Sequence, residues 1–181
     1  MKYIVLLILS IPVIFFSRHT FLKVNAHGFY RFFSWMSIVW LFSNNYSYWF
    51  KNPLSVQQLF SWFFLLLSIY CVLAGMLLLK NAKSKELDRE DDNLYAFEKT
   101  TNLIDYGIYK YIRHPLYASL LYLTWGIFLK NCTIHLFIIS LLSSLMLLLT
   151  AVSEEKECTV FFGDSYKAYM KSSKRFIPFI F

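Results

Sequence analysis

The feature that most constrains this chain is a stretch of 21 residues without a charged side chain, at positions 59–79. At about 1.5 Å per residue, a helix of this length is roughly 31 Å long and crosses the hydrocarbon core of a bilayer. A second apolar stretch covers positions 133–152. The chain is 57% hydrophobic and only 16% charged, whereas soluble domains have about 25% charged residues. These observations predict a small integral membrane protein.

Three shorter apolar segments, at positions 3–16, 32–42 and 116–129, need tilt or interfacial flanks to cross a bilayer. Counted together with the two long stretches, they predict an all-α fold, a polytopic membrane bundle of four to five transmembrane helices. The first of them has an alternative interpretation as a signal peptide, because Lys2 precedes it and a possible cleavage site follows at positions 24–26.

Three basic residues argue against the signal peptide. Arg18, His19 and Lys23 lie between the apolar run and the possible cleavage site, which is unusual for such a peptide. We therefore expect a retained first helix. The chain shows no internal repeat, so residues 1–181 are predicted to be one membrane domain, with transmembrane helices in 1–100 and the chemically versatile side chains in 101–181.

Basic residues are divided very unequally between the expected loops. Fifteen of the 18 Lys and Arg residues fall in segments 17–31, 80–115 and 153–181, which five helices place on one side of the membrane. The positive-inside rule then puts the C-terminus and the polar site in the cytoplasm. The net charge of +7 suits anionic lipid headgroups. We expect no nucleic-acid partner, because the charges alternate with long apolar runs.

Glycines and cysteines exclude several kinds of site. The five glycines stand alone in the sequence, so neither a dinucleotide-binding glycine motif nor a P-loop is present. The three cysteines are scattered and have no spacing typical of zinc ligands or of a disulfide framework. No metal site is predicted.

One polar motif leads directly into an apolar segment. Pro115 suits the first turn of a helix, where its missing N–H costs nothing. Arg113 and His114 then lie at the positive end of that helix, which attracts carboxylates and phosphates. Tyr117 shares a helix face with His114, and Gly107 permits a tight turn before the motif.

A second polar motif follows the last apolar stretch. Glu154 and Glu155 lie where the chain leaves the apolar run. Gly163 is expected to end this helix, and Asp164 to cap a new one. Each group alone has an ordinary explanation as a membrane anchor or a solvated helix end. Because both motifs lie on the same predicted side, we expect a polar site at the cytoplasmic mouth of the bundle.

Both motifs resemble the signatures of the isoprenylcysteine carboxyl methyltransferase family. The sequence Gly107-Ile-Tyr-Lys-Tyr-Ile-Arg-His-Pro-Leu-Tyr117 resembles G-x-Y-x-x-x-R-H-P-x-Y. The pair Glu154-Glu155 begins a stretch that resembles the C-terminal signature E-E-x(6)-F-G-x-x-Y-x-x-Y, and the chain closes on Arg175-Phe-Ile-Pro178. The resemblance covers about residues 101–181. It departs from the family at Ser119, where a glycine is usual, and at Lys174, where a proline is common.

The resemblance implies an integral membrane methyltransferase that uses S-adenosylmethionine and acts on a lipophilic small molecule or a lipidated acceptor similar to isoprenylcysteine. By family likeness, Arg113 and Glu155 are catalytic residues that organise the pocket and the reacting groups. The residues implied in cofactor binding are Thr101, Asn102, Leu103, Ile104, Tyr109, His114, Pro115, Leu116, Tyr117 and Glu154.

Two alternatives stay open at this point. Membrane reductases that resemble the sterol reductases also have an R-H-P-x-Y motif and use NADPH, although the Glu-Glu and Phe-Gly motifs fit the methyltransferases better. A non-catalytic membrane scaffold is the other alternative, but it would not need both the Arg-His and the Glu pairs. The motifs do not choose among prenylated cysteine, phospholipid amine and small-thiol acceptors.

Overall fold

A computed structural model describes residues 1–18, 20, 27–82 and 103–180 of the chain. The described residues form helices and no strand, as the sequence predicts. The elements in order are α1 (Lys2–Ser17), α2 (His27–Asn45), η1 (Tyr46–Tyr48), α3 (Val56–Ala82), η2 (Gly107–Lys110), α4 (Pro115–Phe128), α5 (Ile134–Phe162) and α6 (Asp164–Ser172).

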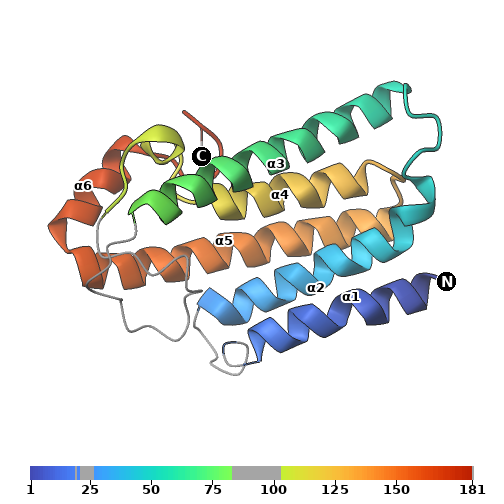
Figure 1. Cartoon of the computed structure of the whole chain (residues 1–181), viewed down its shortest axis with the longest axis horizontal. Helices are drawn as coiled ribbons and strands as arrows, with labels where there is room; N and C mark the ends of the chain where they lie inside the picture. Colours follow the sequence, from blue (N-terminus) through green and yellow to red (C-terminus); the bar gives the residue numbers. More distant parts are fainter. Residues whose placement is uncertain (19, 21–26, 83–102, 181) are drawn as a thin grey trace.

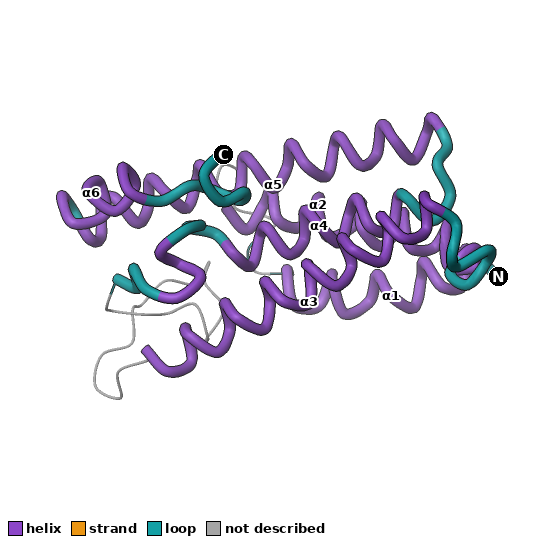
Figure 2. Tube along the Cα trace, turned by 90° about the horizontal axis from the view of Figure 1, so that it is seen from above, coloured by secondary structure: helices purple, strands orange, loops and turns teal. Residues whose placement is uncertain are grey.

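The five long helices lie side by side and alternate in direction along the bundle (Figure 1). α4 contacts α2, α3 and α5, and α1 lies on the outside against α2. A view turned by 90° shows α6 and the C-terminal segment beyond the same end of α4 (Figure 2). The arrangement brings the Arg-His motif and the C-terminal motif to one end of the molecule.

Two helices are long and apolar enough to cross a membrane, namely Val56–Asn81 and Ile134–Phe162. The outward side chains of α3 include Phe63, Leu66 and Leu73, each more than half exposed. Such a surface is expected of a helix that faces lipid rather than water. The apolar helices α1 and α4 are shorter, and the count of four to five spans stays a prediction.

The polar end of the last long helix differs in detail from the prediction. α5 continues through Glu154 and Glu155 for two further turns before it ends at Phe162. Gly163 ends it with a φ of 61°, as expected. The prediction that Asp164 caps the next helix is wrong, because Gly163 occupies the cap position and Asp164 is the first helical residue. The Asp164 carboxylate instead accepts a bond of 2.8 Å from Lys167.

Small and hydroxyl side chains position α4 in the centre of the bundle. The Ser143 hydroxyl lies 3.0 Å from that of Ser34 and 3.2 Å from that of Thr124, so one hydroxyl cluster links α2, α4 and α5. A side chain at Gly126 would lie 2.9 Å from Leu65, so this glycine permits the close approach of α3 and α4. Such contacts are typical of helix packing in membranes.

Candidate active site

The segment before α4 is held in place by the end of the chain. The backbone N–H groups of Arg113 and His114 donate to the carbonyls of Lys174 and Arg175, at 2.7 and 3.2 Å. The Lys174 N–H in turn donates to the carbonyl of Tyr111 at 2.9 Å. These bonds place residues 173–176, which we call the C-terminal strap, against the turn that carries the Arg-His motif.

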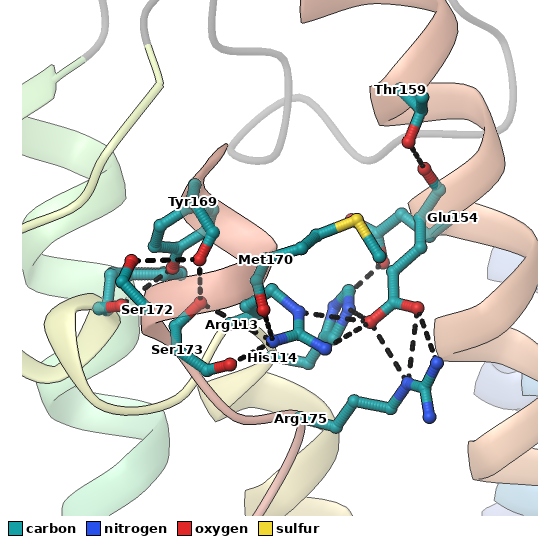
Figure 3. Close-up of polar contacts among 11 residues, drawn as sticks. Arg113, His114, Glu154, Thr159, Tyr169, Met170, Ser172, Ser173 and Arg175 are labelled. Atoms are coloured by element: carbon teal, nitrogen blue, oxygen red, sulfur yellow. Dashed lines mark hydrogen bonds and ion pairs between the residues drawn. The ribbon is translucent and has the colours of Figure 1, made fainter. Parts of the chain in front are cut away.

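The carboxylate of Glu155 accepts hydrogen bonds from two arginines. The Nε and Nη2 of Arg113 donate to its Oε1 at 3.1 and 3.0 Å. Arg175 donates from Nε to both oxygens, at 3.0 and 3.1 Å, and from Nη2 to Oε2 at 2.9 Å. Figure 3 labels both arginines, and dashed lines from their guanidinium groups mark these bonds. The side chains of Glu155 and Arg113 are 5% and 7% exposed, so the pair is shielded from water.

Arg113 also joins the site to the C-terminal strap. Its Nη1 donates to the backbone carbonyl of Ser173, and to that of Met170 at 3.2 Å (Figure 3). A single guanidinium therefore contacts α5, α6 and the strap. The geometry assigns Arg113 a structural task in addition to its charge, since it fixes three segments relative to one another.

His114 lies between the two glutamates. Its Nδ1 is 3.5 Å from an oxygen of Glu154, and its Nε2 is 3.4 Å from an oxygen of Glu155. The imidazole stacks on the ring of Tyr117, with centroids 5.5 Å apart. Burial by itself lowers the pKa of His114, but the two neighbouring carboxylates outweigh it, so the pKa lies above its ordinary value.

Five of the predicted site residues converge in this way: Arg113, His114, Tyr117, Glu154 and Glu155. Pro115 is the first residue of α4, as predicted, and is buried.

The remaining predicted cofactor residues lie further along the same end of the bundle. Ile104 and Tyr109 pack with Leu116 in a small apolar cluster at the end of α3. Leu103 packs in a separate cluster around Tyr166 and Tyr169. The hydroxyl of Tyr169 donates to the carbonyl of Tyr109 at 2.7 Å, which connects the two clusters. Thr101 and Asn102 lie outside the described residues.

Sequence reasoning missed three polar participants. Arg175 belongs to a tail motif in the sequence, but in the structure it is also the second guanidinium that binds Glu155. His27 and Glu157 form a pair, with Nδ1 2.8 Å from Oε2, next to Glu154. Glu157 lies one helical turn beyond Glu154, so the helix periodicity of the sequence is a signal that places it next to the site. No sequence signal predicts His27, because it is 130 residues away and on α2.

A large apolar cavity adjoins the site. It has a volume of about 770 Å³ and is lined by residues of α1, α2, α3 and α4 and by Trp49. Leu116, Tyr117 and Ser119 of α4 contribute to its wall. Tyr117 therefore both stacks on His114 and lines the cavity, which places the cavity next to the polar cluster.

Comparisons with known proteins agree with the motifs. The profile of the phospholipid methyltransferase family matches residues 56–165. Methanethiol S-methyltransferase from Pseudomonas deceptionensis is 30% identical over 71 residues, which are 39% of this chain and 26% of that protein. The chain thus aligns with about a quarter of this relative. No solved structure matches. The match over more than half of the chain confirms the methyltransferase resemblance: this helical membrane protein belongs to the phospholipid methyltransferase family.

Proposed function

We propose that the protein transfers a methyl group from S-adenosylmethionine to a lipophilic acceptor. The observation that carries this proposal is a pair of buried polar atoms, His114 Nε2 and Glu154 Oε2, which have no hydrogen-bond partner in the described part of the chain. Their charged neighbours lie 3.4–3.5 Å away. Buried polar groups without hydrogen bonds are costly, so these atoms are suited to a polar ligand.

The residues fit the chemical groups of S-adenosylmethionine. Glu154 suits a ribose hydroxyl or an amine, because its carboxylate accepts hydrogen bonds. Arg113 and His114 lie before the N-terminus of α4 and favour a carboxylate. Tyr109 and Tyr117 offer aromatic faces for adenine or for a cation. When bound, the cofactor supplies an activated methyl group on its sulfonium.

The protein's own residues then have to orient two reactants and exclude water. In our proposal Arg113 and Glu155 organise the site, because their hydrogen bonds fix the turn before α4 against α5 and the C-terminal strap. The apolar cavity beside Tyr117 supports a lipophilic acceptor. The names of the family and of the relative describe a lipid acceptor and a thiol acceptor. An acceptor similar to isoprenylcysteine has the same lipophilic character.

The proposal extends to the organisation of the chain in the membrane. Residues 1–181 act as one membrane domain with several spans, and the site faces the cytoplasm, where S-adenosylmethionine is made available. The basic residues of the described chain support this orientation. Arg18, Lys80 and Lys110 lie towards the end of the bundle that carries α6, while Lys51 lies in the α2–α3 connection at the opposite end (Figure 1).

Ligand binding tests the proposal. Purified protein is incubated separately with radiolabelled S-adenosylmethionine and with NADPH. We expect saturable binding of S-adenosylmethionine alone, followed by methyl transfer to a component of a membrane lipid extract. Binding of NADPH alone would replace the proposal by the reductase alternative, which the comparisons do not support. Binding of neither ligand would favour a scaffold.

A further inference from the structure

The residues that line the apolar cavity extend lengthwise along the bundle, and we call this space the channel. On α2 its lining residues run from Arg31 to Phe42, and on α4 they run from Leu116 to Ile127. Each interval covers 12 positions and therefore 11 helical rises, so both helices give a channel length of roughly 17 Å at 1.5 Å per residue. The volume of about 770 Å³ lies in the usual range for a site that holds one small molecule, about 300–1,000 Å³.

The two ends of this channel differ in polarity. Ser17, Arg31 and Tyr117 line the end next to His114 and the glutamates. Phe42, Trp49 and Ile127 line the opposite end, which has only apolar and aromatic side chains among its described lining residues. A molecule that matches this gradient has its reacting group at Tyr117 and an apolar chain that extends towards Trp49.

Trp49 is held firmly at the far end of the channel. Its ring makes edge contacts with Phe42 and Trp62, at centroid distances of 5.4 and 6.2 Å. The ammonium of Lys130 lies 5.1 Å from the Trp49 ring and 3.6 Å from the Trp62 ring. Cation–π contacts of this kind are favourable, and more so when water is excluded. They leave the indole little freedom to move away from an approaching chain.

Hydrogen bonds fix Lys130 itself. Its Nζ donates to Gln58 Oε1 at 3.1 Å, while Gln58 Nε2 donates to the Lys130 carbonyl at 3.0 Å. Both side chains are buried. The end wall is therefore a packed unit from the α2–α3 connection, α3 and the end of α4. Packed interiors resist continuous deformation, so this wall stops a chain that is too long.

We propose that Trp49 limits the length of the apolar chain that the acceptor carries. The inference rests on the proposed function, since it assumes that the channel holds the acceptor. Trp49 would then be a specificity residue that belongs to none of the sequence motifs. It lies about 17 Å from the polar site, as judged from the helical rise along α2 and α4. A longer acceptor chain has no room between Tyr117 and the indole of Trp49.

Tethered chains test this limit without methyl donor or turnover. Ser17 lines the polar end of the channel, so Ser17→Cys is made in a protein whose Cys71, Cys132 and Cys158 are replaced by Ser. A series of n-alkyl methanethiosulfonates, from butyl to octadecyl, attaches chains of increasing length. We expect the unfolding temperature to rise with chain length up to a maximum and to fall beyond it. Ser119→Cys, at the same end, is a second attachment point.

Substitution of the end wall then gives the decisive comparison. In Trp49→Ala, or in the milder Trp49→Leu, the highest unfolding temperature should be reached with chains that are longer by several methylene groups. Phe60→Ala is the control, because this aromatic side chain near the same end of α3 is 58% exposed and does not line the channel. Its unfolding temperature should be highest at the same chain length as in the parent protein. The inference would be overturned if the unfolding temperature of the Trp49 variants were highest at the same chain length as in the parent protein, or if it did not depend on chain length.

The proposed function fails by a different measurement. If Trp49 does not limit the chain length, the parent protein should still bind S-adenosylmethionine. Absence of that binding, together with a normal shift of the maximum in Trp49→Ala, would reject the methyltransferase proposal and retain the channel and its end wall.

Discussion

The guanidinium of Arg113 and the carboxylate of Glu155 form a buried ion pair with two hydrogen bonds of 3.0 and 3.1 Å, although 42 residues separate them in the chain. The pair fixes the turn before α4 against α5, two turns before that helix ends at Phe162. Because Arg113 also donates to Ser173 and Met170, its guanidinium joins the ion pair to the C-terminal strap.

Replacement of Arg113 by Lys should lower methyl transfer at least tenfold, which corresponds to about 1.4 kcal/mol of transition-state stabilisation. Lys keeps the positive charge, but its ammonium cannot reproduce the planar set of bonds to Glu155, Met170 and Ser173. We expect the variant to insert and fold. The initial rate of label transfer from S-adenosylmethionine, at matched protein levels, measures the effect.

Lys110→Gln is the control for this experiment, because Lys110 is exposed and lies in the turn just before the motif. Its rate should match that of the parent. A Lys variant of Arg113 with the parent rate would show that the residue serves only as a charged membrane anchor.

Substitution at Glu155 should destabilise the protein more than substitution at Arg175. Glu155→Gln leaves Arg113 buried without its carboxylate, and loss of one partner from a buried pair costs about 3–5 kcal/mol. The Arg175 side chain is 29% exposed, and Arg175→Gln leaves the Arg113 pair in place. The unfolding temperatures of both variants in detergent show which substitution destabilises the protein more. A larger drop in unfolding temperature for Arg175→Gln would contradict the prediction.

Sequence patterns predicted the parts of this site that follow from local rules. A proline preceded by Arg113 and His114 marks a helix start, and α4 begins at Pro115. The charge pattern and the family resemblance predicted that Glu154 and Glu155 meet this motif, and the ion pairs confirm it.

The missed features depend on tertiary packing. The Arg175 contact with Glu155 requires the C-terminal strap to lie against the turn before α4, and no periodicity in the sequence encodes that. His27 becomes a partner of Glu157 only because α2 runs antiparallel to α5. Trp49 belongs to none of the sequence motifs, and only the packing of the helices shows that it contributes to the wall of a cavity.

Loss of either polar side chain at the proposed cofactor site should weaken donor binding. Glu154→Gln and His114→Ala each remove a charge-assisted contact worth about 1.5–3 kcal/mol, which is a ten- to hundredfold loss in affinity. Equilibrium binding of labelled S-adenosylmethionine measures it. Glu157→Gln is a comparison on the same helix and outside the predicted cofactor set. If both site variants bind like the parent, the pocket lies elsewhere.

The raised pKa of His114 predicts a pH dependence of stability. The folded protein holds this proton more tightly than the unfolded chain, whose histidine pKa is about 6.5. The stabilisation is therefore complete below about pH 6.5 and is lost as the pH rises through the folded value. His114→Gln should flatten this part of the curve of unfolding free energy against pH. A parallel curve for the variant would show that other groups cause the dependence.

The division of basic residues predicts the orientation in the membrane, and two exposed lysines at opposite ends of the bundle allow a direct test. Lys51 lies in the α2–α3 connection and Lys167 in α6 (Figure 1). Each is replaced by Cys in a protein whose exposed Cys132 and buried Cys71 and Cys158 are changed to Ser. A membrane-impermeant maleimide should label Lys51→Cys on intact cells, and Lys167→Cys only after lysis, because the positive-inside rule predicts a cytoplasmic location for the end rich in Lys and Arg. The reverse pattern would place the proposed cofactor site outside the cell, where S-adenosylmethionine is not made, and would contradict the proposed function together with the orientation.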